Sequence, residues 1–321
     1  MYITRKQFLV FLGALCGMLT MPIHAQNKPI TIIVGASPGG STDTLARVVG
    51  QSMGKSLDRA VVIENKPGAG GNIAAQAVAK GNPDGATLLM SFTSHSINES
   101  LFPDLPFDAV EDFTPITMVA QVPSVLVARK GLPFNDVKGL IDYAKKNPGK
   151  LTFAIGGQGS SLHLASEQFK TATQTDILNV PYKGTGPALN DLVAGQTVDL
   201  MFASTINVLP YYKTNKIQFI GHSSTKDLPQ FPGLKPINET VPGYSSQAWF
   251  GLFGPPNMPA DVLATLYKAA NEAINSPDYI KRMDAEAATV PTMTPPEFTA
   301  FIRKDVEHWG NIVKASGAKI D

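Results

Sequence analysis

Residues 30–47, ITIIVGASPGGSTDTLAR, restrict the possible folds more than any other stretch of this chain. Residues 30–34 are mostly β-branched and predict a buried strand. The glycine-rich residues 35–40 end that strand, and residues 41–49 carry helix-capping side chains followed by apolar residues at helical spacing. Such a turn directs free backbone N–H groups and the positive end of the helix dipole to one point. The stretch therefore indicates either a site for a small anion or a tight connection without a ligand.

The order strand, glycine turn, helix, strand, glycine turn, helix, strand, polar loop occurs twice along the chain. Alternating strands and helices imply parallel strands whose loops gather at one edge of the sheet. In the first copy we expect strands at 30–34, 60–64 and 87–92, turns at 35–40 and 65–72, and a polar loop at 93–96. In the second copy we expect strands at 151–155, 177–181 and 198–202, turns at 156–161 and 182–186, and a loop at 203–205.

Two apolar stretches are expected to connect the two copies. Residues 113–129 form a long β-branched run, broken by two prolines, that predicts a strand leaving one domain and entering the other. Residues 248–253 predict the returning strand. We therefore expect an α/β fold of two similar domains around a cleft, joined by two hinge crossings. The expected division is a discontinuous domain 1 at 26–124 plus 247–321, and domain 2 at 125–246.

Residues 1–25 predict an export signal, with a basic pair, an apolar run over 8–21 and a cleavage position after Ala25. Lys6 stands where a twin-arginine signal has its second arginine, so the general secretory route is favoured. The single cysteine, Cys16, lies in this segment. The exported chain would then carry no thiol and no disulfide, as suits a periplasmic protein.

The composition and the absence of certain motifs exclude several classes of function. The chain has 27 basic and 26 acidic residues with no basic run, which argues against a nucleic-acid partner. It has no complete nucleotide-binding glycine motif and no histidine pair at metal-ligand spacing. We therefore expect no cofactor and no metal, and we expect a monomer.

The chain resembles the Bug-type solute receptors, which are the extracytoplasmic binding proteins of tripartite tricarboxylate transporters. The motifs that carry the resemblance lie at 36–47, 64–72, 82–85, 159–165, 181–184, 249–252 and 255–259. The resemblance implies a type II periplasmic-binding fold that closes on a small carboxylate, held by backbone amides and hydroxyls of the glycine turns. Family ligands include amino-acid, tricarboxylate and aromatic carboxylates. Residues 35–38, Gly-Ala-Ser-Pro, stand where many relatives carry an aromatic residue, so the ligand itself stays open.

The candidate ligand contacts lie in these turns and loops, where glycine lets the backbone approach a ligand closely. In the first domain they are Ser37, Gly39, Gly40, Ser41, Thr42, Asp43, Gly71, Asn72, Ser94 and His95. In the second domain they are Gly159, Ser160, Ser161, His163, Tyr182, Lys183, Gly184, Thr185, Gly186 and Ser204.

Some of these candidates have a structural alternative. The carboxylate of Asp43 would repel an anion, so we expect it to cap the helix, or else to accept a bond from a ligand amine or hydroxyl. His95 and His163 are also suited to capping or packing, and Lys183 to solvent. Trp249, at the returning crossing, is expected to pack in the hinge rather than to contact an aromatic ligand.

An enzyme is the main rival reading, because residues 35–39 also spell the G-x-S-x-G of a hydrolase nucleophile turn with Ser37 at its centre. The residue after that nucleophile must supply an oxyanion-hole N–H, and Pro38 has none. We therefore expect no catalytic residue. The resemblance implies instead a periplasmic receptor that captures a small organic carboxylate by domain closure and delivers it to a membrane transporter. A ligand-presenting sensor component for a membrane kinase is the alternative, since both partners would read the closed conformer.

Overall fold

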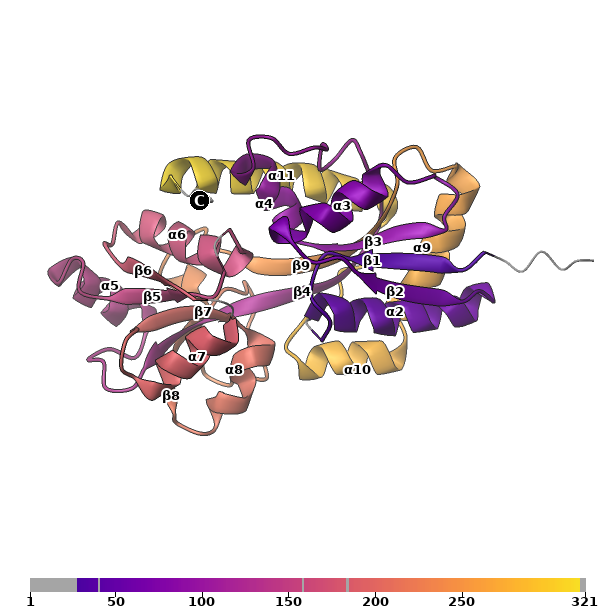
Figure 1. Cartoon of the computed structure of the whole chain (residues 1–321). Helices are drawn as coiled ribbons and strands as arrows, with labels where there is room; N and C mark the ends of the chain where they lie inside the picture. The colour runs from indigo at the N-terminus through magenta and orange to yellow at the C-terminus, as the bar shows by residue number, and fades with distance from the viewer. Residues whose placement is uncertain (1–27, 40, 158, 183–184, 318–321) are drawn as a thin grey trace, which may run out of the picture.

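The structure is a computed structural model that describes residues 28–39, 41–157, 159–182 and 185–317. The expected signal segment and the candidates Gly40, Lys183 and Gly184 lie outside the described residues. The chain forms two α/β lobes side by side, with the long helix α11 (Pro295–Ser316) lying along both (Figure 1).

The first lobe is built on a mainly parallel sheet. Its strands β1 (Ile30–Val34), β2 (Val61–Asn65) and β3 (Thr87–Phe92) are parallel to one another, and β9 (Gln247–Gly254) is antiparallel to β3. The strands predicted at 30–34, 60–64 and 87–92 are confirmed to within one residue. Four of the five residues of β1 are buried, as expected for a strand that is covered on both faces.

The second lobe repeats this plan. Its strands β5 (Thr152–Ile155), β6 (Leu178–Pro181) and β7 (Leu200–Ser204) are parallel, with β5 in the middle. The strand β8 (Ile217–His222) is antiparallel to the strand β4 (Thr114–Arg129), which also pairs with β7.

Two strands connect the lobes at a crossing. Residues 114–123 of β4 pair with β9 in the first lobe, and residues 124–129 pair with β7 and β8 in the second. The two pairings meet where Pro123 lies opposite Gln247 and Ser124 lies opposite Ser204. The predicted outgoing and returning strands are therefore confirmed. The domain boundaries near 125 and 247 stay a prediction, and they coincide with this change of partner.

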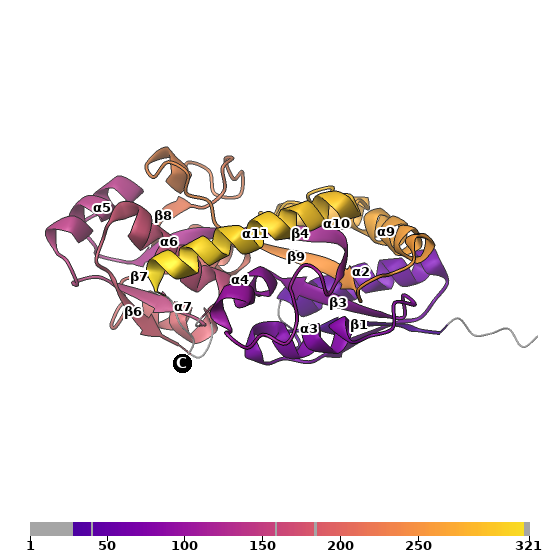
Figure 2. The same cartoon turned by 90° about the horizontal axis from the view of Figure 1, so that it is seen from above.

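Helices cover both faces of the sheet (Figures 1 and 2). The helices of the first lobe are α2 (Ser41–Leu57), α3 (Asn72–Ala79), α4 (Ser94–Leu101), α9 (Ala260–Ile274) and α10 (Pro277–Ala285). Those of the second are α5 (Val137–Lys146), α6 (Ser161–Thr173), α7 (Thr185–Ala194) and α8 (Thr205–Tyr212). The prediction of polar loops at 93–96 and 203–205 was wrong, because α4 begins at Ser94 and α8 begins at Thr205.

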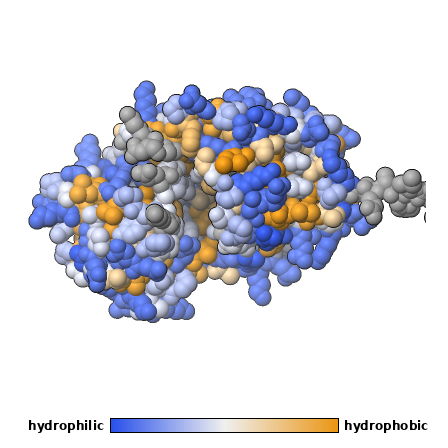
Figure 3. Space-filling model, in the orientation of Figure 1, coloured by the Kyte–Doolittle hydropathy of each residue, from blue (hydrophilic) through white to orange (hydrophobic). Residues whose placement is uncertain are grey.

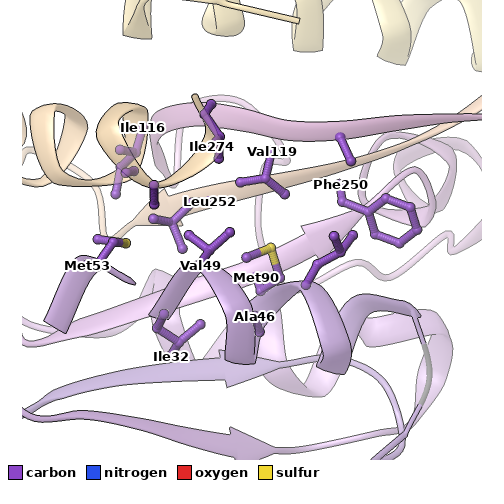
Figure 4. Packing of buried hydrophobic residues seen from close by; sticks show 14 of the residues in the cluster. Ile32, Ala46, Val49, Met53, Met90, Ile116, Val119, Phe250, Leu252 and Ile274 are labelled. Carbon is purple, nitrogen blue, oxygen red and sulfur yellow. The ribbon is translucent and has the colours of Figure 1, made fainter. Parts of the chain in front are cut away.

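A large apolar core holds α2 and α9 against the sheet of the first lobe. Ala46, Val49 and Met53 of α2 recur at helical spacing and pack over Ile32 of β1 and neighbouring side chains (Figure 4). This packing fixes the axis of α2, and so it fixes where the N-terminal end of the helix and the turn before it lie.

A smaller core cluster joins the lobes through α11. Trp309 and Val313 of α11 pack with Ile97 and Leu101 of α4, in the first lobe, and with Leu164 of α6, in the second. Figure 2 shows α11 continuing past the first lobe to α6. The two lobes are thus connected by side-chain packing as well as by the two strands.

Candidate ligand-binding cleft

The carboxyl ends of the parallel strands in both lobes point toward the crossing. Phe92, the last residue of β3, lies opposite Phe250, near the start of β9, and Ser204, the last residue of β7, lies opposite Ser124. The helices α4 and α8, which follow these strands, therefore begin near the crossing, and the carboxyl ends of strands are where ligands bind in open α/β sheets. Figure 3 shows a groove between the two lobes on this face.

The first glycine turn is held by the carboxylate of Asp43. Its Oδ2 accepts from the Gly39 amide (2.9 Å) and from Nε of Arg47 (3.0 Å), and its Oδ1 accepts from Nη2 of Arg47 (2.9 Å) and Nδ2 of Asn65 (3.0 Å). Arg47, with Gly39 and Asn65, lowers the pKa of Asp43 to about 2, although burial opposes this. Asn65 also donates to the carbonyl of Ala36 (3.0 Å).

The expected bond from Asp43 to a ligand is corrected. Asp43 is 3% exposed, and four protein donors already occupy its two oxygens. It lies in the first turn of α2 and accepts from the amide of Gly39 before the helix, a contact that orders the turn at the helix start, so its capping role stays a prediction. Ser37, Gly39 and Ser41, in contrast, are exposed beside it.

The second glycine turn lies directly against the first. A Cβ atom on Gly35 would come within 2.8 Å of the Cα of Gly71, so only glycine allows this approach. Gly71 itself has φ +97°, in the left-handed region. The amide of Asn98 supports the turn by donating to the carbonyl of Gly70 (3.2 Å) and to Oδ1 of Asn72 (2.6 Å). The Oδ1 atom of Asn72 is thus committed to the protein.

His95 does not face the groove, so the ligand contact expected for it is wrong. It is 3% exposed, its Nε2 is 2.8 Å from the carbonyl of Ala109, and its ring packs among Phe113, Phe253 and other aromatic rings. Burial lowers its pKa to about 4, so the ring is neutral at pH 7. Ser94, one residue earlier and at the start of α4, is also buried.

The glycine turn of the second lobe is ordered by His163 and Ser160. The Gly159 amide donates to Nδ1 of His163 (3.1 Å), while the Ser160 hydroxyl caps α6 by accepting from the His163 amide (3.2 Å) and donates to the carbonyl of Gly157 (2.8 Å). Burial lowers the pKa of His163, which suits this acceptor role. The expected capping and packing role of His163 is the one that the geometry provides.

The remaining candidates of the second lobe lie beside this turn. The hydroxyl of Tyr182 bonds Asp191 of α7, and burial raises its pKa to about 12, so this hydroxyl is not aimed at a ligand. Thr185 begins α7, and its backbone lies within 2.9 Å of the position of a Cβ on Gly156. The hydroxyl of Ser204 donates to Oδ1 of Asn207 (2.9 Å).

A cavity of about 360 Å³ lies between the lobes at the first turn. Gly39, Ser41 and Thr44 border it from the first turn and α2, Ile206 and Asn207 from α8, and Arg282, Met283 and Glu286 from α10 and its end. The hydroxyl of Thr205 donates to the carbonyl of Glu286 (2.9 Å), so α8 and α10 are joined across the lobes. Asn207, Arg282 and Glu286 were not predicted from the sequence. The start of α8 at Thr205 could have indicated Asn207 as a candidate, whereas no local sequence pattern marked Arg282 or Glu286.

Two lobes of parallel strands, with their carboxyl ends turned toward a two-strand crossing and a cavity between them, define the periplasmic binding-protein class of fold. Residues 45–318 match the family model described as the tripartite tricarboxylate transporter family receptor. The chain belongs to this family, whose members are solute-binding receptors of the periplasm. The expected fold class and the resemblance to Bug-type receptors are both confirmed.

Individual relatives agree with this assignment. BugT of Bordetella pertussis is 32% identical over the whole of both chains. The periplasmic binding protein BugD is 33% identical with a TM-score of 0.78, covering 91% of this chain and 99% of its own. An R. palustris protein solved with adipate is 30% identical with a TM-score of 0.81 (92% and 99% covered), and MatC of Rhodopseudomonas palustris, with bound malate, is 32% identical with 0.77 (89% and 98% covered).

The described residues include no helix that is both long and apolar enough to cross a bilayer. In the same part of the chain, no three or more His, Cys, Asp or Glu side chains are grouped as a metal would require.

Proposed function

We propose that this chain is an exported receptor that captures a small organic carboxylate between its lobes and delivers it to a membrane transporter. One observation carries the proposal: the first glycine turn borders an inter-lobe cavity whose opposite wall comes from α8 of the second lobe. The adipate and malate bound by the two R. palustris relatives support a carboxylate as the ligand.

The binding energy would come from backbone amides and hydroxyls. Each charge-assisted hydrogen bond to a carboxylate contributes about 1.5–3 kcal/mol, so three or four of them give roughly 8 kcal/mol, or micromolar affinity, after the costs of closure. The proposed contacts are Ser37, Gly39, Gly40, Ser41, Thr42, Gly71, Ser94, Gly159, Ser160, Ser161, Lys183, Gly184, Thr185, Gly186 and Ser204. In this proposal Asp43, Asn72, His163 and Tyr182 hold the turns in place.

Closure about the crossing would present the liganded form to a membrane partner. A permease and a sensor-kinase ectodomain would both read that form, so capture of membrane proteins with and without ligand would separate them. We propose no covalent chemistry, because Pro38 has no N–H to offer at the G-x-S-x-G sequence of residues 35–39.

A thermal-shift screen of mono-, di- and tricarboxylates, amino acids and aromatic acids tests the proposal. A ligand at a hundredfold excess over its dissociation constant stabilises the protein by about 2.7 kcal/mol. Ser37→Ala should weaken binding about tenfold. Ser56→Ala should not, because Ser56 lies at the other end of α2, where its hydroxyl bonds Glu272. Shifts with neutral sugars or cations and none with acids would refute the anion assignment. Ester turnover lost in Ser37→Ala would instead establish a hydrolase.

A further inference from the structure

The inter-lobe cavity has the size and position of a ligand subsite. Its volume of about 360 Å³ lies within the range of small-molecule pockets, about 300–1,000 Å³. It begins at Gly39 and Ser41 in the first turn and extends to α10, away from the second glycine turn. A ligand with one carboxylate at the turn would therefore place its other end here.

Arg282 provides an unused carboxylate-binding group in this cavity. Its Nε is 3.2 Å from Oε1 of Glu286, and its terminal nitrogens have no hydrogen-bond partner within the described part of the chain. Its side chain is 41% exposed, so a ligand can reach it. The two terminal N–H groups of a guanidinium match the two oxygens of a carboxylate, and the group stays charged at every relevant pH.

The groups beside Arg282 also favour a carboxylate ligand. Because the Ser204 hydroxyl donates to Oδ1 of Asn207, the Nδ2 of Asn207 is left as a donor at the cavity. Glu286 is the one acidic group on the cavity wall, and its Oε1 is already paired with Arg282. The terminal nitrogens of Arg282 and the Nδ2 of Asn207 are thus left as hydrogen-bond donors for an anion in the cavity.

We infer that this cavity holds the second carboxylate of a dicarboxylate, with Arg282 as the residue that distinguishes a dicarboxylate from a monocarboxylate. The inference rests on the proposed function, since the first carboxylate is taken to lie at the glycine turn. It assigns a contact from α10 that none of the turn residues provides, and it brings both lobes onto one ligand through Asn207 and Arg282.

The test measures the affinity of the purified protein for matched acids of equal length, adipate and hexanoate, and for succinate and butyrate, by calorimetry. Of adipate and succinate, the one that binds more tightly should bind at least about tenfold more tightly than the monocarboxylate of equal length, hexanoate or butyrate. Arg282→Gln should abolish that preference and leave monocarboxylate affinity within about twofold, and Arg282→Lys should retain part of it. Glu286→Gln should strengthen dicarboxylate binding, because it removes a negative charge from the subsite.

Arg303 offers a matched control. It also pairs with a glutamate, Glu111, on the exposed side of α11, so Arg303→Gln makes the same charge change outside the cavity and should leave all affinities unaltered. Equal binding of both acids, or an equal loss for both in Arg282→Gln, overturns the subsite while leaving the receptor assignment intact. Weaker dicarboxylate binding in Glu286→Gln also overturns it, because removing a negative charge beside a bound carboxylate should not weaken its binding. If no acid binds the wild type, the proposed function fails as well.

Discussion

At the scale of single residues, the carboxyl groups of Asp43 and Asp305 lie in opposite electrostatic environments. Asp43 accepts from Arg47, Asn65 and a loop amide, which hold its pKa at about 2. Asp305 of α11 is half-buried at the contact with β9, where Nε1 of Trp249 donates to its Oδ2 (2.6 Å). Loss of solvent raises the pKa of Asp305 to about 6, and the hydrogen bond from Trp249 offsets this only in part. The surroundings of Asp43 therefore stabilise the charged form of its carboxyl group, whereas those of Asp305 stabilise the neutral form.

The pKa of Asp305 predicts a specific pH dependence of stability. A carboxyl whose pKa is higher in the folded than in the unfolded protein stabilises the fold at low pH, and this stabilisation is lost as the pH rises from about 4 to about 6. A difference of about two pKa values corresponds to roughly 3 kcal/mol. The free energy of unfolding of the wild type, measured in urea and compared with Asp305→Asn at each pH, should therefore fall by about 2–3 kcal/mol between pH 4 and pH 7. Parallel pH curves for the two proteins would contradict this.

At the scale of the element, α11 connects the outer surface to the candidate turns. It packs on α4 and α6, which begin at Ser94 and just after Ser160, so both helices that it contacts start in candidate turns. Leu164 is fully buried in this cluster, although it belongs to the other lobe. Movement of one lobe relative to the other therefore acts on the packing of Leu164 against α4 and α11.

Leu164→Ala should therefore lower both stability and ligand affinity. The buried cavity costs about 2–5 kcal/mol in the free energy of unfolding, and the loosened α6 displaces the turn at Ser160. Leu140→Ala on α5 is the control, since Leu140 is equally buried in the same lobe but lies in a different cluster. Urea denaturation should detect a loss in both variants, whereas calorimetry should detect weaker binding in Leu164→Ala alone. Unchanged affinity in Leu164→Ala would mean that α11 has no part in binding.

At the scale of the whole molecule, the lobes are joined by β4 and β9, and the partners of β4 change between Pro123 and Ser124. Pro123 has no N–H to add to the ladder at this point, and the N–H of Ser124 bonds the hydroxyl of Ser223 (2.9 Å) instead of a strand carbonyl. Bending is expected where the ladder is weakest.

Saturation with a bound acid should decrease the radius of gyration measured by small-angle X-ray scattering, because the lobes close on the ligand. An acid that gives no thermal shift serves as the control and should leave the scattering unchanged. A ligand that binds with an unaltered radius of gyration would exclude closure as the way this receptor signals its loaded state.

Local patterns were sufficient to predict most of the strands and glycine turns. The β-branched runs at 30–34 and 87–92 and the long run at 113–129 each contain their own signal, because strand periodicity and glycine turns are properties of a few neighbouring residues. The repeated order of these elements predicted two lobes joined by two crossings. The helix starts at Ser94 and Thr205 were missed, because polar residues after a strand suit a loop and a capped helix equally well.

The direction of each side chain within the site depended on the tertiary structure. His95 follows Ser94 on the same helix, yet its ring packs into an aromatic cluster formed by residues more than ten positions away. The partners of Asp43 include Asn65 from another element, and Arg282 borders the cavity only because α10 packs beside α8. The sequence by itself determined the elements, their order and the family, since these follow from local pattern and motif. Which side chains face the cleft was decided only by packing between distant segments, because that depends on long-range contacts that no local spacing encodes.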